Sequence, residues 1–255
     1  MMGKLRPSVC IDAVLENVPD PEALALVNET GIGAFEFWGW WDRDLQALMT
    51  AKKGQQLDLA ACCTHFVSLV DPICREQYLE GLGQSIEAAQ LLGCKTLISQ
   101  VGDAIEGRSR ESQYLSLVDG LRDAAELLEK SGVTLVIEPL NLLVNHPGYF
   151  LVESREAFEV VDAVGSDHVK VVFDIYHQQV SEGNVINNLV SNIDKIGHFH
   201  AAGNPGRNEL TRGELNYQQI FDAIQSTDYE GFVGLEYWPL GDPRAGLEEV
   251  ARWFE

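Results

Sequence analysis

The chain has 255 residues, of which 45% are hydrophobic, enough to bury a large core in one α/β domain. Its formal net charge of −21 excludes nucleic acid and anionic membranes as expected partners, because phosphate groups are bound by clustered Lys and Arg. No run approaches the roughly eighteen apolar residues of a membrane span, and the first residues lack the apolar segment of a signal peptide. The five cysteines have no CxxC spacing, so we expect a cytoplasmic protein with reduced thiols.

Strand and helix patterns alternate through the first half of the chain. Short apolar runs predict strands at 8–11, 34–37, 57–62 and 95–99. Helical spacing of apolar residues predicts helices at 21–29, 42–53, 72–92 and 110–130. Asp20 is the expected N-cap of the first of these helices. Gly93 and Gly132 follow the two long helices, as is typical of C-terminal caps.

Each of the next four predicted strands ends in a side chain that can bind a metal ion. The strands lie at 133–138, 169–174, 195–200 and 231–236, and they end in Glu138, Asp174, His200 and Glu236. Pro139 follows Glu138 directly and cannot donate to a sheet ladder, so we expect that strand to end there. Helices are predicted near 154–163, 185–192, 217–226 and 244–254.

Eight strand–helix units in a chain of this length predict a closed (β/α)₈ TIM barrel, an α/β fold, as a single domain over residues 1–255. An open, doubly wound sheet is the competing architecture. We rank it lower because residues 12–16, after the first strand, contain no glycine for a phosphate-binding turn. In a barrel the loops after the strands form the active face, so the loop at 201–216 is expected to cover the site.

The four strand ends predict a metal site. Two Glu, one Asp and one His offer three oxygen ligands and one nitrogen, which suits Mg²⁺, Mn²⁺ or Co²⁺ with open positions for substrate oxygens. Such a cation acts as a Lewis acid on a carbonyl and the neighbouring hydroxyl of a small sugar or hydroxy acid. Glu138 and Glu236 can then move a proton between adjacent carbons. Taken alone, a carboxylate at a strand end is more often a salt-bridge partner, and a single histidine is more often a buried core residue. The prediction of a metal site therefore depends on the four residues occurring together.

Two further positions are less determined by the pattern. His198 and His200 lie on one predicted strand, and we expect only one of them to face the barrel interior. Glu36, in the segment Phe35-Glu-Phe-Trp38, either contacts the substrate or pairs with a nearby arginine. Trp38 either forms a wall of the pocket or packs in an ordinary aromatic contact.

These segments resemble the hydroxypyruvate isomerase family of the xylose isomerase-like TIM barrels, and the resemblance covers nearly the whole chain. It rests on Phe35-Glu-Phe-Trp38, Ile137-Glu-Pro-Leu-Asn141, Phe173-Asp-Ile-Tyr-His-Gln178, residues 198–209, Gly213-Glu-Leu-Asn-Tyr217 and Gly234-Leu-Glu-Tyr-Trp-Pro239. The resemblance implies that Glu138, Asp174, His200 and Glu236 bind one divalent metal ion. It also implies that Glu138 and Glu236 are the catalytic proton donor and acceptor, and that His177 and Arg207 contact oxygens of a small-molecule substrate.

The reaction implied by the resemblance converts hydroxypyruvate to tartronate semialdehyde through a cis-enediolate. A ketose 3-epimerase or a dehydratase on the same site is an alternative, as is a non-catalytic sugar-binding barrel. An endonuclease of the same superfamily is disfavoured for two reasons. It needs a basic DNA-binding face, whereas this chain has a net charge of −21, and it needs additional histidine ligands for more metal ions, whereas this chain has six histidines. Exposed aromatic residues in the loops after the second and eighth strands could form the contact of a homo-oligomer, which is a possible state of the protein.

Overall fold

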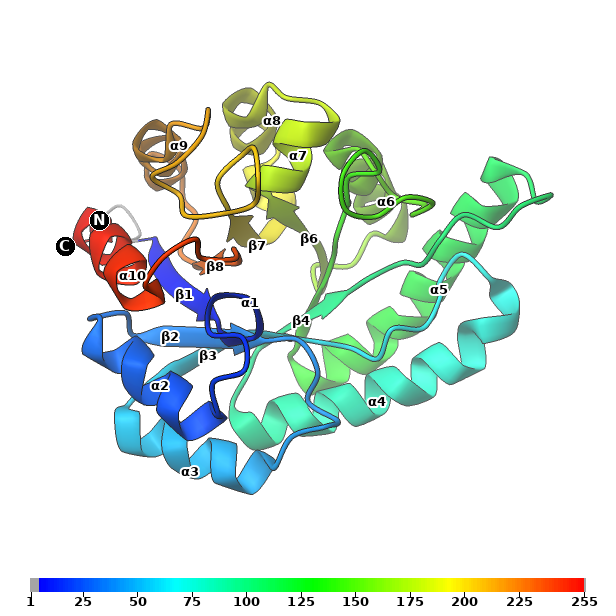
Figure 1. Ribbon diagram of the computed structural model, residues 1–255. Coiled ribbons are helices and arrows are strands. Elements are labelled where there is room, and N and C mark those ends of the chain that lie inside the picture. Colours follow the sequence, from blue (N-terminus) through cyan, green and yellow to red (C-terminus); the bar gives the residue numbers. More distant parts are fainter. Residues whose placement is uncertain (1–4, 255) are drawn as a thin grey trace.

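Eight parallel strands form a closed barrel in the computed structural model, which describes residues 5–254 (Figure 1). The strands follow chain order around the barrel, and β8 closes it by pairing with β1. They are β1 (Arg6–Cys10), β2 (Ala34–Phe37), β3 (Asp58–Cys63), β4 (Thr96–Ser99), β5 (Thr134–Ile137), β6 (Val169–Asp174), β7 (Ile196–Ala201) and β8 (Phe232–Leu235). The predicted (β/α)₈ barrel is confirmed, and the open sheet is excluded because a closed barrel has no edge strands.

The apolar runs form strands because both faces of this sheet are buried. Leu135, Val136 and Ile137 of β5 are all 0% exposed, although successive side chains of a strand point to opposite faces. Val136 packs with Val172 and Ile98 in a small cluster of buried residues. Leu135 and Ile137 belong to the large cluster that also includes residues of the surrounding helices. A strand covered on both faces gains no advantage from polar residues at alternate positions.

The helices surround the barrel. They are α1 (Ile11–Val14), α2 (Asp20–Glu29), α3 (Leu45–Gln55), α4 (Arg75–Leu92), α5 (Arg110–Ser131), α6 (Ser154–Val164), α7 (Ile175–Ser181), α8 (Val185–Ser191), α9 (Tyr217–Gln225) and α10 (Pro243–Ala251). Three short 3₁₀ segments occupy Pro72–Cys74, Ile193–Lys195 and Arg252–Phe254. Gly93 and Gly132 end α4 and α5 in the left-handed region, with φ of 70° and 72°, as predicted.

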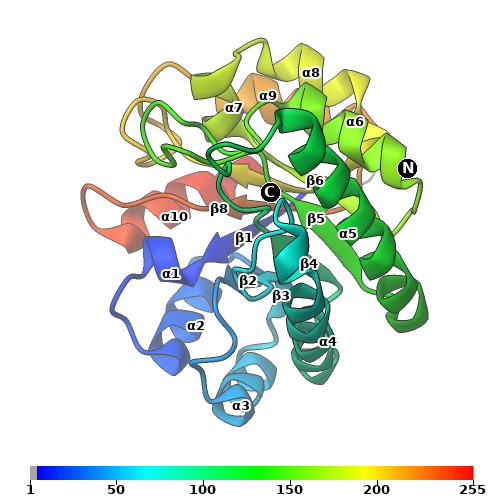
Figure 2. The same cartoon turned by 90° about the vertical axis from the view of Figure 1, so that its right-hand side faces the viewer.

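The long helices α4 and α5 lie side by side and extend along one side of the barrel (Figure 2). Ser109 caps α5 by accepting a hydrogen bond from the backbone N–H of Ser112. Within residues 5–254, no helix combines the length and the hydropathy needed to cross a membrane.

Two short helices and one cap differ from the sequence prediction. Helices α1 and α7 begin directly where β1 and β6 end, so each lacks the separating turn that usually marks a helix start. Asp20 is the first residue of α2 rather than its N-cap, and Pro19 holds the cap position without a side-chain bond. The Asp20 carboxylate instead forms an ion pair with Arg43.

Candidate active site

The four predicted metal-binding side chains lie together at the carboxyl ends of β5 to β8. Glu138 and Glu236 directly follow β5 and β8, whereas Asp174 and His200 face each other in the pairing of β6 with β7. Each residue offers one ligand atom, and these four atoms all lie within 4.8 Å of one another. Each of the four residues is at most 6% exposed. The structure therefore brings the four strand ends to one point at one mouth of the barrel.

His200 connects two of the carboxylates through one ring nitrogen. Its Nδ1 atom lies 3.3 Å from Oε1 of Glu138 and 3.4 Å from Oε2 of Glu236. Burial lowers the pKa of His200, but Glu236 and Glu36 outweigh burial and raise this pKa well above its ordinary value. The surroundings that favour a proton on this ring also favour a metal cation beside it.

Asp174 takes part in both the fold and the site. Its Oδ1 atom accepts a hydrogen bond of 2.9 Å from the backbone N–H of His177, which caps α7. Its Oδ2 atom lies 3.6 Å from Nε2 of His177 and 3.5 Å from Nη2 of Arg207. The residue that ends β6 is therefore also the residue that starts the next helix, and this geometry leaves one carboxylate oxygen for the site.

His177 lines the cavity with a defined tautomer. The backbone N–H of Asn141 donates to Nδ1 of His177 at 3.2 Å, so Nδ1 is an acceptor and the neutral ring carries its proton on Nε2. Burial lowers the pKa of His177 well below its ordinary value, and Arg207 lowers it further. The Nε2 atom has no hydrogen-bond partner among residues 5–254, which leaves an N–H donor at the cavity.

Arg207 reaches the site from the loop between β7 and α9. Its Nη2 atom donates to Oε2 of Glu236, and its guanidinium lies 5.1 Å from the ring centroid of Trp238. Arg207 has a φ of 55°, an uncommon conformation for a residue with a side chain, and its carbonyl accepts from the backbone N–H of Trp238 at 2.9 Å. The expectation that loop 201–216 covers the site is consistent with this position of Arg207 over the carboxylates.

A cavity of about 260 Å³ opens beside these residues. It is lined by Trp38, Cys63, Phe66, Ile98, Gln100, Glu138, Leu140, His146, His177, His200, Arg207, Glu236 and Trp238. Trp38 forms part of the wall, and its indole Nε1 donates to Oε1 of Glu236 at 2.8 Å. His146 and Phe66 did not emerge from the sequence, because loop residues after β3 and β5 carry no periodic pattern that indicates their direction.

The structure places Glu36 behind His200 and outside the set of residues that line the cavity. Neither sequence alternative for Glu36 describes this position, because its partners are Ser8, His198 and His200. The expectation that only one of the two histidines faces the interior is wrong. Residues two apart on a strand share a face, so His198 and His200 both point inward and both contact Glu36.

The charges of the site are compatible with a divalent cation. Burial raises the pKa of the Glu138 carboxyl above its ordinary value, and contact with His200 opposes that shift. Three buried carboxylates lie together, and the guanidinium of Arg207 contacts two of them. Buried charges of one sign are costly unless a cation compensates them. Three carboxylates with one imidazole form an oxygen-rich ligand set that Mg²⁺ or Mn²⁺ can accept, whereas structural zinc favours thiolates.

A known family combines this fold with such a site. The sequence profile described as Xylose isomerase-like TIM barrel matches residues 24–255, which defines the class of the chain. Hydroxypyruvate isomerase of Escherichia coli (strain K12) is 39% identical over 180 residues, which cover 71% of this chain and 68% of that protein. The chain belongs to the hydroxypyruvate isomerase family within this class and is an isomerase.

Two further proteins are similar to this chain. The 2-oxo-tetronate isomerase of Cupriavidus necator is 35% identical over 166 residues, or 65% of this chain and 64% of that protein. A crystal structure described as AP endonuclease, family 2, from Brucella melitensis superposes with a TM-score of 0.91 and 29% identity, covering 97% of this chain and 98% of that chain. The fold is therefore shared over nearly the full length with a solved structure.

Proposed function

We propose that the chain isomerises a small 2-keto-3-hydroxy acid of the hydroxypyruvate type with the help of one divalent cation, Mg²⁺, Mn²⁺ or Co²⁺. The observation that carries the proposal is the convergence of Glu138, Asp174, His200 and Glu236 beside the cavity that also presents His177 and Arg207. A cation held by these four residues would polarise the carbonyl and hydroxyl oxygens of the substrate as a Lewis acid. The side chains of the protein would carry out proton transfer and substrate binding.

Glu138 and Glu236 are the proposed pair that moves the proton. They follow β5 and β8, which lie three places apart in a ring of eight strands, so they approach the cavity from different sides. One carboxylate removes the proton from the hydroxyl-bearing carbon, which gives an enediolate. The proton is then returned to the former carbonyl carbon, and the hydroxyl hydrogen passes to the former carbonyl oxygen. Hydroxypyruvate thereby becomes an aldehyde, whereas a four-carbon 2-keto-3-hydroxy acid becomes an isomeric ketone. Burial keeps both carboxylates apart from bulk water during the transfer.

Arg207 and His177 are the proposed substrate-binding residues. Nε of Arg207 is buried and has no hydrogen-bond partner among residues 5–254, so this N–H is available to an acceptor in the cavity. A charged guanidinium N–H forms a stronger hydrogen bond to a carboxylate than to a neutral hydroxyl, which suits a keto acid better than a neutral sugar. The Nε2–H of His177 can donate to a second substrate oxygen.

The cavity also favours a small substrate. Its volume of about 260 Å³ is below the usual range for drug-sized ligands, and Trp38, Phe66 and Trp238 restrict its width. The names of the two relatives, hydroxypyruvate isomerase and 2-oxo-tetronate isomerase, both describe acids with a keto group beside a carboxylate. We therefore propose an acid of three or four carbons rather than a hexulose.

The Brucella melitensis structure is described as an endonuclease, but the charge of this chain argues against a DNA substrate. Asp and Glu number 39 against 18 Lys and Arg, so the chain lacks the excess of positive charge that phosphate binding needs. A DNA-cleavage assay on an abasic duplex provides a direct check, and we expect no cleavage.

A substrate panel tests the proposal. The purified protein is assayed with hydroxypyruvate, 2-oxo-tetronate, erythrulose, fructose and tagatose, with Mg²⁺, Mn²⁺ or Co²⁺ and after chelation. We expect turnover of an acid, its loss on chelation and its return with added cation. In D₂O the product should carry deuterium at the carbon that receives the proton. Turnover of ketoses alone would favour the 3-epimerase, and turnover that resists chelation would contradict the metal requirement.

A further inference from the structure

A second buried cluster lies inside the barrel behind His200. Its members are Ser8 of β1, Glu36 of β2, His198 of β7 and Gly234 of β8, and none of them lines the active-site cavity. Glu36 is 2% exposed, Ser8 is 0% exposed and His198 is 1% exposed. A carboxylate this deeply buried is costly unless its oxygens are paired, so the cluster needs a physical explanation.

Both oxygens of Glu36 lie close to polar side chains. Oε2 accepts from the hydroxyl of Ser8 at 2.7 Å and lies 2.9 Å from Nε2 of His198. Oε1 lies 2.9 Å from Nε2 of His200. Neither of these last two atoms has a hydrogen-bond partner among residues 5–254, so their approach at 2.9 Å is an ion-pair contact and not a formed hydrogen bond. Glu36 is thus oriented through one oxygen, and its other oxygen faces His200.

The backbone makes room for this arrangement. A Cβ atom at Gly234 would lie 2.6 Å from Cδ of Glu36, so a side chain there would displace the carboxylate. The pairing of β2 with β3 shifts in register between Phe35 and Phe37, at the position of Glu36. Irregularities of this kind redirect a side chain locally. Three strands besides β2 therefore contribute to holding one carboxylate.

We propose that Glu36 is a positioning residue that sets the tautomer of His200 for cation binding, an inference that rests on the proposed metal site. A neutral imidazole has one N–H donor and one acceptor nitrogen. If Glu36 accepts the proton of Nε2, the lone pair of Nδ1 faces Glu138 and Glu236, where the cation would be held. A carboxylate behind a histidine ligand orients the ring and makes the ligand nitrogen more basic.

Without Glu36, nothing in this arrangement favours the tautomer of His200 that carries its proton on Nε2. The proton could then move to Nδ1, where it would be donated to Glu138 and the cation would be excluded. Loss of such a carboxylate behind a ligand typically weakens metal affinity by roughly 10- to 100-fold. The alternative is that Glu36, His198 and His200 hold a cation of their own, since each offers one ligand atom within 4.8 Å of the others.

Binding of Mn²⁺ alone, measured by electron paramagnetic resonance of the free ion, tests the inference without reference to turnover. We expect one Mn²⁺ per chain in the unaltered protein and roughly 10- to 100-fold weaker binding in Glu36→Gln. Glu209→Gln is the matched control, because Glu209 is also buried but accepts from the backbone N–H of Leu240, outside the cavity. This control should bind Mn²⁺ as the unaltered protein does.

The possible results separate the inference from the proposed function. No Mn²⁺ binding by the unaltered protein would overturn the metal site itself. One Mn²⁺ bound equally well by the unaltered protein and by Glu36→Gln would overturn only the role of Glu36. Two Mn²⁺ per chain would assign the cluster to a second cation and overturn the positioning role.

If Glu36→Gln does not fold, nitrogen-15 NMR of the unaltered protein with Mg²⁺ gives the answer directly. A proton on Nε2 of His200 and none on Nδ1 supports the inference, whereas a proton on Nδ1 overturns it.

Discussion

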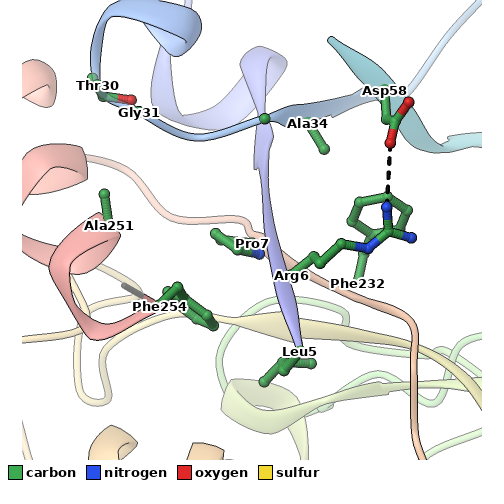
Figure 3. Close-up of a pocket in the computed structure, with 11 residues that line it drawn as sticks. Leu5, Arg6, Pro7, Thr30, Gly31, Ala34, Asp58, Phe232, Ala251 and Phe254 are labelled. Carbon is green, nitrogen blue, oxygen red and sulfur yellow. Dashed lines mark hydrogen bonds and ion pairs between the residues drawn. The ribbon is translucent and has the colours of Figure 1, made fainter. Parts of the chain in front are cut away.

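The two ends of the barrel hold cavities of opposite character. At the carboxyl ends of the strands, the smaller cavity, of about 260 Å³, is bordered by buried carboxylates and histidines. At the amino ends of β1, β2, β3 and β8, a larger cavity, of about 410 Å³, is lined mainly by apolar and small residues (Figure 3). Its charged residues, Arg6 and Asp58, pair with each other at 3.2 Å (Figure 3).

Volume is therefore a poor guide to function in this molecule. The side chains of Arg6 and Asp58 are 50% and 66% exposed, so water satisfies their charges and nothing further has to bind. Glu138 and Glu236 are both 6% exposed and lie beside other acidic groups, so their burial is costly unless cationic groups such as Arg207 or a bound cation compensate it. Buried acidic side chains, and not cavity volume, therefore distinguish the end of the barrel where the candidate active site lies.

The largest expected effect is that of Glu138→Gln. The variant keeps the shape of the side chain but removes the carboxylate that we propose moves the proton and holds the cation, so kcat/KM should fall by at least about 10²- to 10⁴-fold. Steady-state assays with the substrate found in the panel measure the change. A variant that retains more than a tenth of the activity would show that Glu138 has no part in the proton transfer.

A smaller effect is expected for Arg207→Lys. Lysine keeps the positive charge but loses the planar pair of donors, so KM for an acidic substrate should rise roughly 10- to 100-fold. The KM for a neutral ketose, where turnover is detectable, serves as the internal comparison and should change less. An unchanged KM for the acid would remove Arg207 from the proposed carboxylate contact.

Trp38→Phe should have a modest effect. The ring remains as a wall of the cavity, but Glu236 loses the indole donor at 2.8 Å, so kcat should fall roughly 2- to 10-fold. Comparison of circular dichroism and of the urea midpoint with those of the unaltered protein checks the fold. A fall in stability with no change in kcat would reduce Trp38 to a packing residue.

The smallest effect is expected at the opposite end of the barrel. Asp58→Asn breaks an exposed ion pair with Arg6, so the free energy of unfolding should change by less than about 1 kcal/mol and kcat/KM should stay the same. Urea unfolding and the same assays measure both quantities. A clear loss of turnover would mean that the two ends of the barrel are coupled and that the amino-terminal end also contributes to function.

Much of the barrel could be read from local patterns. The runs at 133–138 and 169–174 predicted β5 and β6 closely, because a strand buried on both faces leaves a continuous apolar signal. Helix α7 was missed, since its start at Ile175 follows Asp174 without a turn. The direction of the Glu36 side chain was missed for another reason, because its partners lie on β1 and β7, distant in the sequence.

The sequence alone determined the alternation of strands and helices and the chemical types at the four strand ends, because periodicity and residue identity are local properties. Only the tertiary structure decided that Glu138, Asp174, His200 and Glu236 lie within reach of one ion, and that Arg207 closes over them. It also decided that Glu36 lies behind His200 and not in the cavity. These relations depend on closure of the barrel and on strand register, which bring together residues as distant in the sequence as Trp38 and Glu236, 198 positions apart.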